Sequence, residues 1–201
     1  MKNIINDSLR AVSILGALSA LSVPALANDG NDMWKDKKYV YVLGNNRVAN
    51  DDSDLERTQG FGVGFGYFLD KWSIETVLFG EVSQDGNSDG SDAKINGISM
   101  HVLKFPFDSV PGLFAKLGLG ISEYSDFPAA TDDDDYLVTQ FKLGGGYLHK
   151  VVVKDFEFGV RFDATYVYGT REERLNAQRN DINSPHFYRD MNYSLGVVIP
   201  F

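Results

Sequence analysis

Apolar and polar residues alternate with a period of two along most of the chain after residue 37. In the segment from Phe156 to Tyr166, every even-numbered residue is apolar or aromatic, whereas Glu157, Arg161 and Asp163 lie at odd positions. Successive side chains of a β-strand point to opposite faces, so this pattern predicts a strand with one apolar and one polar face. The fold must therefore give the two faces of each strand different surroundings.

The same alternation divides the chain into eight candidate strands with connections of alternating length. The strands are expected at 38–46, 59–69, 71–83, 94–106, 112–124, 135–150, 155–169 and 187–201. Short turns are expected at 69–71, 108–112 and 150–155, and long polar loops at 46–58, 84–93, 125–134 and 170–186. Each strand supplies the roughly 9–11 residues that a tilted strand needs to cross a bilayer. The pattern predicts an all-β fold, an eight-stranded antiparallel up-and-down transmembrane β-barrel.

A water-soluble sandwich or lipocalin-like barrel would show the same alternation with its faces reversed. The apolar faces here are rich in large aromatic and aliphatic residues, whereas the opposite faces carry Gly, Ser and charges of both signs. Aromatic residues also cluster beside the short turns, which is typical of an interfacial girdle. The expected girdle consists of Trp34, Tyr39, Tyr41, Tyr67, Phe68, Trp72, Phe105, Phe107, Tyr147 and Phe156. These features favour the membrane barrel.

The first 27 residues have the layout of a secretory signal peptide. Lys2 and Arg10 precede an apolar stretch at 11–21, and Ala25 and Ala27 form an Ala-x-Ala cleavage site. The apolar stretch is shorter than the roughly 20 residues of a membrane-spanning helix, which argues against an uncleaved anchor. We expect a cleaved signal peptide at 1–27, a periplasmic lead-in at 28–37 and an exported barrel domain at 38–201.

Composition excludes several classes of function. The chain has no cysteine, which excludes a disulfide scaffold, a thiolate zinc site, an iron–sulfur cluster and a cysteine nucleophile. Its 28 acidic and 19 basic residues give a net charge of -9, which argues against nucleic acid as a partner because phosphate binding needs a basic surface. The mean hydropathy of -0.21 is low for a membrane protein, because averaging along each strand cancels the apolar face against the polar one.

The chain resembles a known family in two segments. Together with the signal peptide and the eight strands, the last segment, Tyr193–Phe201, resembles the OmpA-like and OmpX-like small outer-membrane β-barrels of Gram-negative bacteria. The stretch 62–68, followed by 72–75, is similar to the second hairpin of that family. The resemblance covers essentially all of 38–201.

The resemblance implies both a partner and a limit. In this family the barrel-assembly machinery is expected to read alternate residues of the last strand. The matching positions here are Tyr193, Leu195, Val197, Ile199 and Phe201. OmpA itself continues into a peptidoglycan-binding domain, and we expect this chain to comprise the barrel domain alone, so that anchoring to the cell wall is not implied.

If the apolar faces meet lipid, the polar faces point into the barrel. We expect an ion-pair network there, because charges facing each other across a narrow lumen are costly unless paired. Its predicted members are Glu75, Glu81, Lys116, Lys142, Glu157, Arg161 and Asp163, with His101 facing the same way. An eight-stranded barrel is only wide enough for its own side chains, which favours a packed polar core. The alternative is a gate, in which Arg161, Lys142 and Lys116 exchange carboxylate partners and open a thin water path.

No catalytic constellation is evident, and we expect the protein not to be an enzyme. The three histidines are His101, His149 and His186, and none lies in the His-x-Ser pattern of the lipid A deacylases. The aspartic-type proteases of the outer membrane have ten strands rather than eight. A lipid A-modifying activity is the enzymatic alternative, and we expect no cofactor.

The long loops contain two acidic motifs. Asp85, Asn87 and Asp89 match the opening of a calcium loop, but the twelfth position is Asn96 instead of the required Glu, so a hairpin tip is favoured over a metal site. The four aspartates at 132–135 are typical of a solvated charge run, with weak binding of divalent cations as the alternative. Three arginines in the longest loop are candidates for contacts with lipopolysaccharide phosphates. They are Arg171, Arg174 and Arg179.

These patterns predict a monomeric, non-enzymatic outer-membrane barrel with both termini in the periplasm. Its expected role is structural support of the envelope or interaction at the cell surface through its loops. The alternatives are a small porin-like channel that uses the charged interior and an adhesin that acts through the loops. The expected partners are outer-membrane lipid, lipopolysaccharide and the barrel-assembly machinery.

Overall fold

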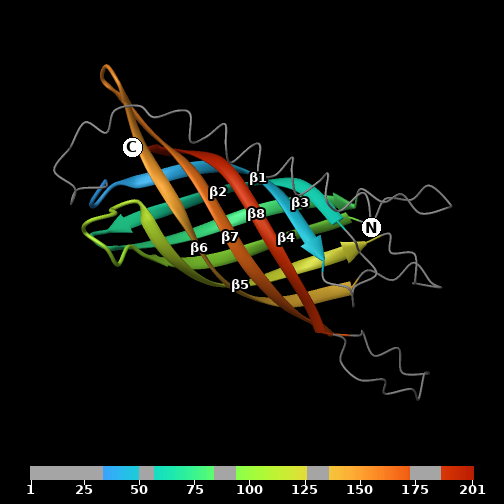
Figure 1. Cartoon of the computed structure of the whole chain (residues 1–201). Helices are drawn as coiled ribbons and strands as arrows, with labels where there is room; N and C mark the ends of the chain where they lie inside the picture. The colour runs from blue at the N-terminus through green and yellow to red at the C-terminus, as the bar shows by residue number, and fades with distance from the viewer. Residues whose placement is uncertain (1–33, 50–56, 84–93, 126–135, 173–186) are drawn as a thin grey trace, which may run out of the picture. The chain divides into compact units, whose positions relative to one another are not determined.

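The computed structural model describes residues 34–49, 57–83, 94–125, 136–172 and 187–201, and the structural statements below concern these residues. Eight β-strands make up almost all of them (Figure 1). The strands are β1 (Lys38–Ala49), β2 (Arg57–Leu69), β3 (Trp72–Ser83), β4 (Lys94–Lys104), β5 (Leu113–Ser125), β6 (Tyr136–Val153), β7 (Phe156–Glu172) and β8 (Phe187–Pro200). Within this part of the chain there is no helix long and apolar enough to cross a membrane.

The strands pair in sequence order and close on themselves. Each strand pairs antiparallel with the next, and β1 pairs with β8 from Tyr39 opposite Pro200 to Ala49 opposite Asp190. The predicted all-β, up-and-down, eight-stranded barrel is therefore confirmed, and every predicted strand boundary lies within three residues of the observed one. Closure leaves no unpaired sheet edge, which is the condition for a sheet to lie in a bilayer.

Two of the short turns are tight because one residue in each takes a left-handed backbone conformation. Asp70, between β2 and β3, has φ 50°, and Lys154, between β6 and β7, has φ 57°. In the first turn Lys71 forms an ion pair of 2.7 Å with Asp108 of the neighbouring β4–β5 turn. This carboxylate raises the pKa of Lys71 above its ordinary value. The ends of the strands at the short turns define what we call the short-turn end of the barrel.

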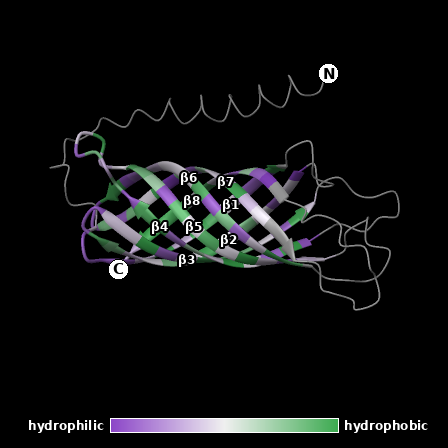
Figure 2. Cartoon of the chain, turned by 90° about the horizontal axis from the view of Figure 1, so that it is seen from below, coloured by the Kyte–Doolittle hydropathy of each residue, from purple (hydrophilic) through white to green (hydrophobic). Residues whose placement is uncertain are grey.

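The outer wall is apolar and the inner wall polar. Large apolar side chains are exposed on the outside, among them Phe61 at 66%, Leu119 at 63% and Leu78 at 60%. The alternate positions point inward, where Arg161 and Asp163 are 2% and 0% exposed. Figure 2 shows hydrophobic and hydrophilic residues alternating along the strands. This is the reverse of a water-soluble barrel and is the arrangement of barrels that cross a membrane.

The predicted aromatic girdle is wrong for half of its members. Trp34, Tyr39, Tyr41, Phe68 and Phe105 are at most 7% exposed and lie inside the barrel. Trp72, Phe107, Tyr147 and Phe156 are 41–55% exposed on the outside, and Tyr67 is half-buried.

Two inward-facing glycines explain why tyrosines fit inside so narrow a barrel. Gly64 and Gly66 of β2 face the lumen, and the rings of Tyr41 and Tyr39 lie over them. A Cβ atom added at either glycine would lie 2.1 Å from a ring carbon of the tyrosine. The absent side chains on β2 therefore provide the space that the β1 aromatics occupy.

Candidate functional site

The lumen is the only part of the described chain in which charged side chains are buried together. Alternate residues of each strand point inward, and their side chains form three layers along the barrel axis. The aromatic layer, at the short-turn end, comprises Trp34, Tyr39, Phe68, Leu103, Phe105, Phe114 and Leu148. The central layer comprises Glu75, His101, Lys116, Arg161 and Asp163. The loop-end layer comprises Arg47, Glu81, Tyr124, Gln140 and Asp190.

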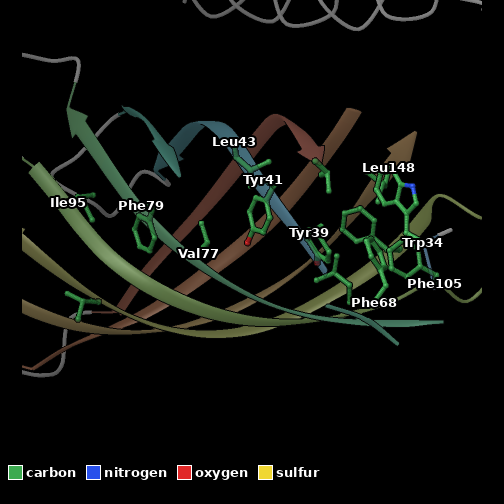
Figure 3. Close-up of a cluster of buried hydrophobic side chains, with 14 of the residues drawn as sticks. Trp34, Tyr39, Tyr41, Leu43, Phe68, Val77, Phe79, Ile95, Phe105 and Leu148 are labelled. Atoms are coloured by element: carbon green, nitrogen blue, oxygen red, sulfur yellow. The ribbon is translucent and has the colours of Figure 1, made fainter. Parts of the chain in front are cut away.

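The aromatic layer is a chain of ring contacts across the short-turn end. Phe68 is its centre, with ring centroids 4.5 Å from Tyr39, 5.6 Å from Trp34 and 5.9 Å from Phe105. Phe105 in turn lies 5.7 Å from Phe114. Figure 3 shows Trp34, Phe68, Phe105 and Leu148 gathered together with Tyr39 next to them. Tilted and edge-on pairs of this kind stabilise a core beyond the area they bury.

The central layer is built around Arg161 of β7. Its Nη1 and Nη2 atoms donate to the two carboxylate oxygens of Glu75 at 2.6 and 3.0 Å, and its Nε donates to Asp163 at 2.8 Å. The guanidinium carbon also lies 5.3 Å from the ring centre of Tyr41 and 5.0 Å from that of Phe114. A forked pair between arginine and a carboxylate is both strong and directional, so these contacts fix Arg161 in one position.

The other polar groups of this layer surround the carboxylates of Glu75 and Asp163. Lys116 donates to Asp163 at 2.5 Å, and Thr165 donates to the same oxygen at 3.2 Å. The hydroxyl of Tyr39 donates to Glu75 at 3.0 Å, which links the central layer to the aromatic layer. Nδ1 of His101 lies 3.3 Å from the other oxygen of Glu75.

The loop-end layer repeats this design around Arg47 of β1. Arg47 forms a close ion pair with Asp190 of β8, in which its Nε donates at 2.7 Å. It also donates to the hydroxyl of Tyr124 at 2.8 Å, and its Nη1 lies 3.8 Å from Glu81. Because β1 and β8 are the first and last strands, the Arg47–Asp190 pair lies across the seam where the barrel closes.

The predicted network is divided in the structure. Four of its seven residues meet in the central layer, namely Glu75, Lys116, Arg161 and Asp163. Glu81 belongs to the loop-end layer, where Thr58 donates to it at 2.9 Å. Lys142 is buried between the two charged layers.

Lys142 has a different environment from the other buried cations. No carboxylate oxygen of the described residues is recorded within 4.0 Å of its Nζ, which donates to Ser99 at 2.7 Å. The same atom lies 4.2 Å from the ring centre of Phe79. Lys142 is therefore held by a hydroxyl and an aromatic face.

Glu157 does not join the lumen charges. It lies at the rim of the short-turn end with its side chain 31% exposed. There it pairs with Lys150 at 3.1 Å and with Lys37 at 3.4 Å, and it accepts a hydrogen bond from Trp34. Glu157 is the second residue of β7, which begins at Phe156 directly after the turn, so it lies at the end of the barrel and not in the charged layers.

Arg47 and Asp190 are lumen residues that the sequence interpretation missed. The sequence predicts Arg47 in the loop at 46–58, whereas β1 continues to Ala49 in the structure. The available signal was the odd or even position of each residue in its strand, because alternate residues face the same side of the sheet. Arg47 has the same parity as the inward Tyr39, Tyr41 and Leu43, and Asp190 has the same parity as the inward Ser194 and Val198.

The buried charges of the described residues balance. Four cations, Arg47, Lys116, Lys142 and Arg161, face four carboxylates, Glu75, Glu81, Asp163 and Asp190. Burial of an unpaired charge is costly, and pairing with additional hydrogen bonds offsets that cost. The arrangement suits a fixed polar core.

The loop motifs lie outside the described residues. These are the calcium-like positions Asp85, Asn87 and Asp89, the aspartates at 132–135, and Arg174 and Arg179; the side chain of Arg171 is likewise not described. In the part of the chain that is described, no group of three or more His, Asp or Glu side chains is placed to hold a metal ion.

Comparison with known proteins gives matches in structure only. No protein-family model matches the sequence, and no curated protein matches it. Among solved structures, the chain is similar to Neisserial surface protein A, with 20% identity over 82% of this chain and 97% of that one and a TM-score of 0.49. It is also similar to the attachment invasion locus protein Ail of Yersinia pestis, with 13% identity over 83% and 99% of the two chains and a TM-score of 0.47. A third match is the outer membrane protein OprG of Pseudomonas aeruginosa, with 15% identity over 83% and 97% and a TM-score of 0.44.

Proposed function

We propose that the protein is an outer-membrane β-barrel with an occluded lumen, a non-enzymatic component of the bacterial envelope. The observation that carries this proposal is the reversed hydropathy of a closed sheet, with exposed large apolar residues outside and balanced, buried charges inside. A closed antiparallel barrel with an apolar outer wall satisfies its backbone hydrogen bonds internally and presents the apolar surface that a lipid bilayer favours. The residues at 1–27, with their signal-peptide pattern, support export.

The filling of the lumen supports a structural role over transport. The side chains of Arg161, Glu75 and Asp163 are at most 2% exposed, and so are those of Trp34 and Phe68 in the aromatic layer. An ion crossing the barrel would have to pass two layers of paired charges and one layer of aromatic rings. A barrel of eight strands is only wide enough for these side chains and leaves no space for an ion beside them.

Planar-bilayer recording tests the occluded lumen. Purified, refolded protein at neutral pH is expected to insert without producing steady single-channel currents. The same recording is made on protein in which Arg161→Ala removes the centre of the charged network. Absence of steady currents from both samples would exclude the channel alternative. Steady currents from the unmodified protein would overturn the occluded lumen and favour the channel alternative.

The last strand supports a second part of the proposal, recognition by the barrel-assembly machinery. Its outward residues form a continuous apolar row with exposed fractions of 40–65%. The row consists of Tyr193, Leu195, Val197, Ile199 and Phe201. Since β8 closes the barrel against β1, an assembly partner that holds this row would control when the barrel closes.

A further inference from the structure

Trp34 is buried at the short-turn end although it precedes the first strand. Its side chain is 1% exposed, whereas the next three residues are exposed. We call residues Trp34 to Lys37 the stopper segment. Two backbone hydrogen bonds tie it to Phe68 of β2, from Asp36 N to Phe68 O at 3.0 Å and from Phe68 N to Lys37 O at 3.0 Å.

The socket of the indole ring is built from strands on both sides of the seam. Phe68 of β2 meets the ring edge-on, and Figure 3 places Leu148 of β6 beside it. Gly159 of β7 forms part of the wall, because a Cβ atom there would lie 2.7 Å from Trp34 Cη2 and 2.7 Å from Leu148 Cδ1. Glu157 accepts a hydrogen bond of 3.0 Å from the indole Nε1.

The backbone of the stopper segment is held in place by these contacts. Trp34 has φ 54° and Asp36 has φ 60°, and both are left-handed conformations that cost energy for residues other than glycine. Neither residue belongs to a strand ladder, since β1 begins at Lys38. Release of the segment would relieve both conformations and leave every strand pair of the barrel intact.

We propose that the stopper segment closes the short-turn mouth of the lumen and undocks locally, without opening of the barrel. Undocking exposes Leu148 and the aromatic layer to solvent from that end, while the central charged layer stays closed. This proposal rests on the proposed function in one respect: in an outer-membrane barrel with both termini in the periplasm, the short-turn mouth faces the periplasm.

Engineered cysteines test this directly, because the chain contains none of its own. Leu148→Cys places a thiol in the wall of the socket, at a position that is 3% exposed. Ser122→Cys places one at a lumen position that is 1% exposed and whose hydroxyl makes no hydrogen bond in the structure. Each folded protein is treated in detergent micelles with a small methanethiosulfonate reagent, and the labelling rate is measured by mass spectrometry.

In a chain with Trp34 intact, Leu148→Cys is expected to react at least about tenfold faster than Ser122→Cys, because local opening is less costly than global opening. Adding Trp34→Ala is expected to accelerate labelling of Leu148→Cys again and to leave Ser122→Cys unchanged. Trp72→Ala is the matched control, because it removes the other tryptophan of the chain, which is 46% exposed on the outer wall.

Two results would overturn the proposal that the stopper segment undocks locally. One is equal labelling of Leu148→Cys with and without Trp34, and the other is equal labelling of the two cysteines in the chain with Trp34 intact. If Trp34→Ala prevents folding, Glu157→Gln removes the charge of the indole's hydrogen-bond acceptor and is expected to accelerate Leu148→Cys alone. Labelling is measured on folded protein in micelles, so its result is independent of whether the protein is found in the outer membrane.

Discussion

Arg161 is the residue on which the central layer depends most. It donates three hydrogen bonds to two carboxylates and lies between the rings of Tyr41 and Phe114. Glu75 and Asp163 are 1% and 0% exposed, so both carboxylates are shielded from bulk water and depend on their cation partners. The cost of a change at this position would arise from the charges that remain.

Truncation of Arg161 is therefore expected to be strongly destabilising. Arg161→Ala should lower the free energy of unfolding by about 3–5 kcal/mol, because it leaves two buried carboxylates with a single cation between them. Guanidinium unfolding of the refolded barrel in lipid vesicles measures this. Arg189→Ala, at an exposed arginine of β8, is the control and should change stability by less than about 0.5 kcal/mol.

A second variant separates loss of the pair from loss of packing. Arg161→Met combined with Glu75→Gln removes both charges and keeps most of the volume, so it should recover part of the stability that Arg161→Ala loses. Equal losses in the single and double variants would contradict a cost that arises from unpaired charge.

Gly66 and Gly44 provide a matched pair of glycines within the β1–β2 hairpin. Gly66→Ala should destabilise the barrel by about 1–3 kcal/mol, because the added Cβ would lie 2.1 Å from the Tyr39 ring. At Gly44 the nearest atom is a backbone oxygen at 3.7 Å, so Gly44→Ala should be close to neutral. The same unfolding measurement compares them, and a neutral Gly66→Ala would show that Tyr39 does not need this space.

At the scale of the element, β8 combines a lumen face and a recognition face. Its inward residues include Asp190 and Ser194, which bond to Arg47 and Asn45 of β1, and its outward residues form the apolar row. The amide of Phe201 also donates to Lys38 O at 2.8 Å, which closes the seam at the short-turn end.

The outward row of β8 should matter more for assembly in the cell than for stability. Phe201→Ala is expected to reduce the amount of folded barrel in the outer membrane several-fold, while refolding of the purified protein into detergent changes little. Leu119→Ala, at an equally exposed apolar position of β5, is the control and should assemble normally. Equal losses for both variants in the cell would mean that the machinery does not read this row.

The strands were predictable from the sequence because alternation is a local property that each strand carries in full. The division of the ion-pair network was not predictable, because the stagger between strands decides which inward residues meet across the lumen. The aromatic girdle failed for a similar reason. The space for Tyr39 depends on Gly66 of a neighbouring strand, and the burial of Trp34 depends on Gly159 of β7.

At the scale of the whole barrel, the outer and inner walls have opposite requirements. The outer wall exposes large apolar residues that water would not favour, and the inner wall buries four cations and four carboxylates that lipid would not tolerate. Both requirements are met when the sheet is closed and its outer wall faces an apolar environment, so the proposed membrane location follows from the fold.

Fractionation with a heat-modifiability gel tests that claim most directly. Cells that express the protein are separated into periplasmic and outer-membrane fractions, and each fraction is run on a denaturing gel with and without boiling. The account predicts a band in the outer-membrane fraction whose mobility changes on boiling, because the closed barrel stays folded in cold detergent. A band in the soluble periplasmic fraction whose mobility boiling does not change would contradict it.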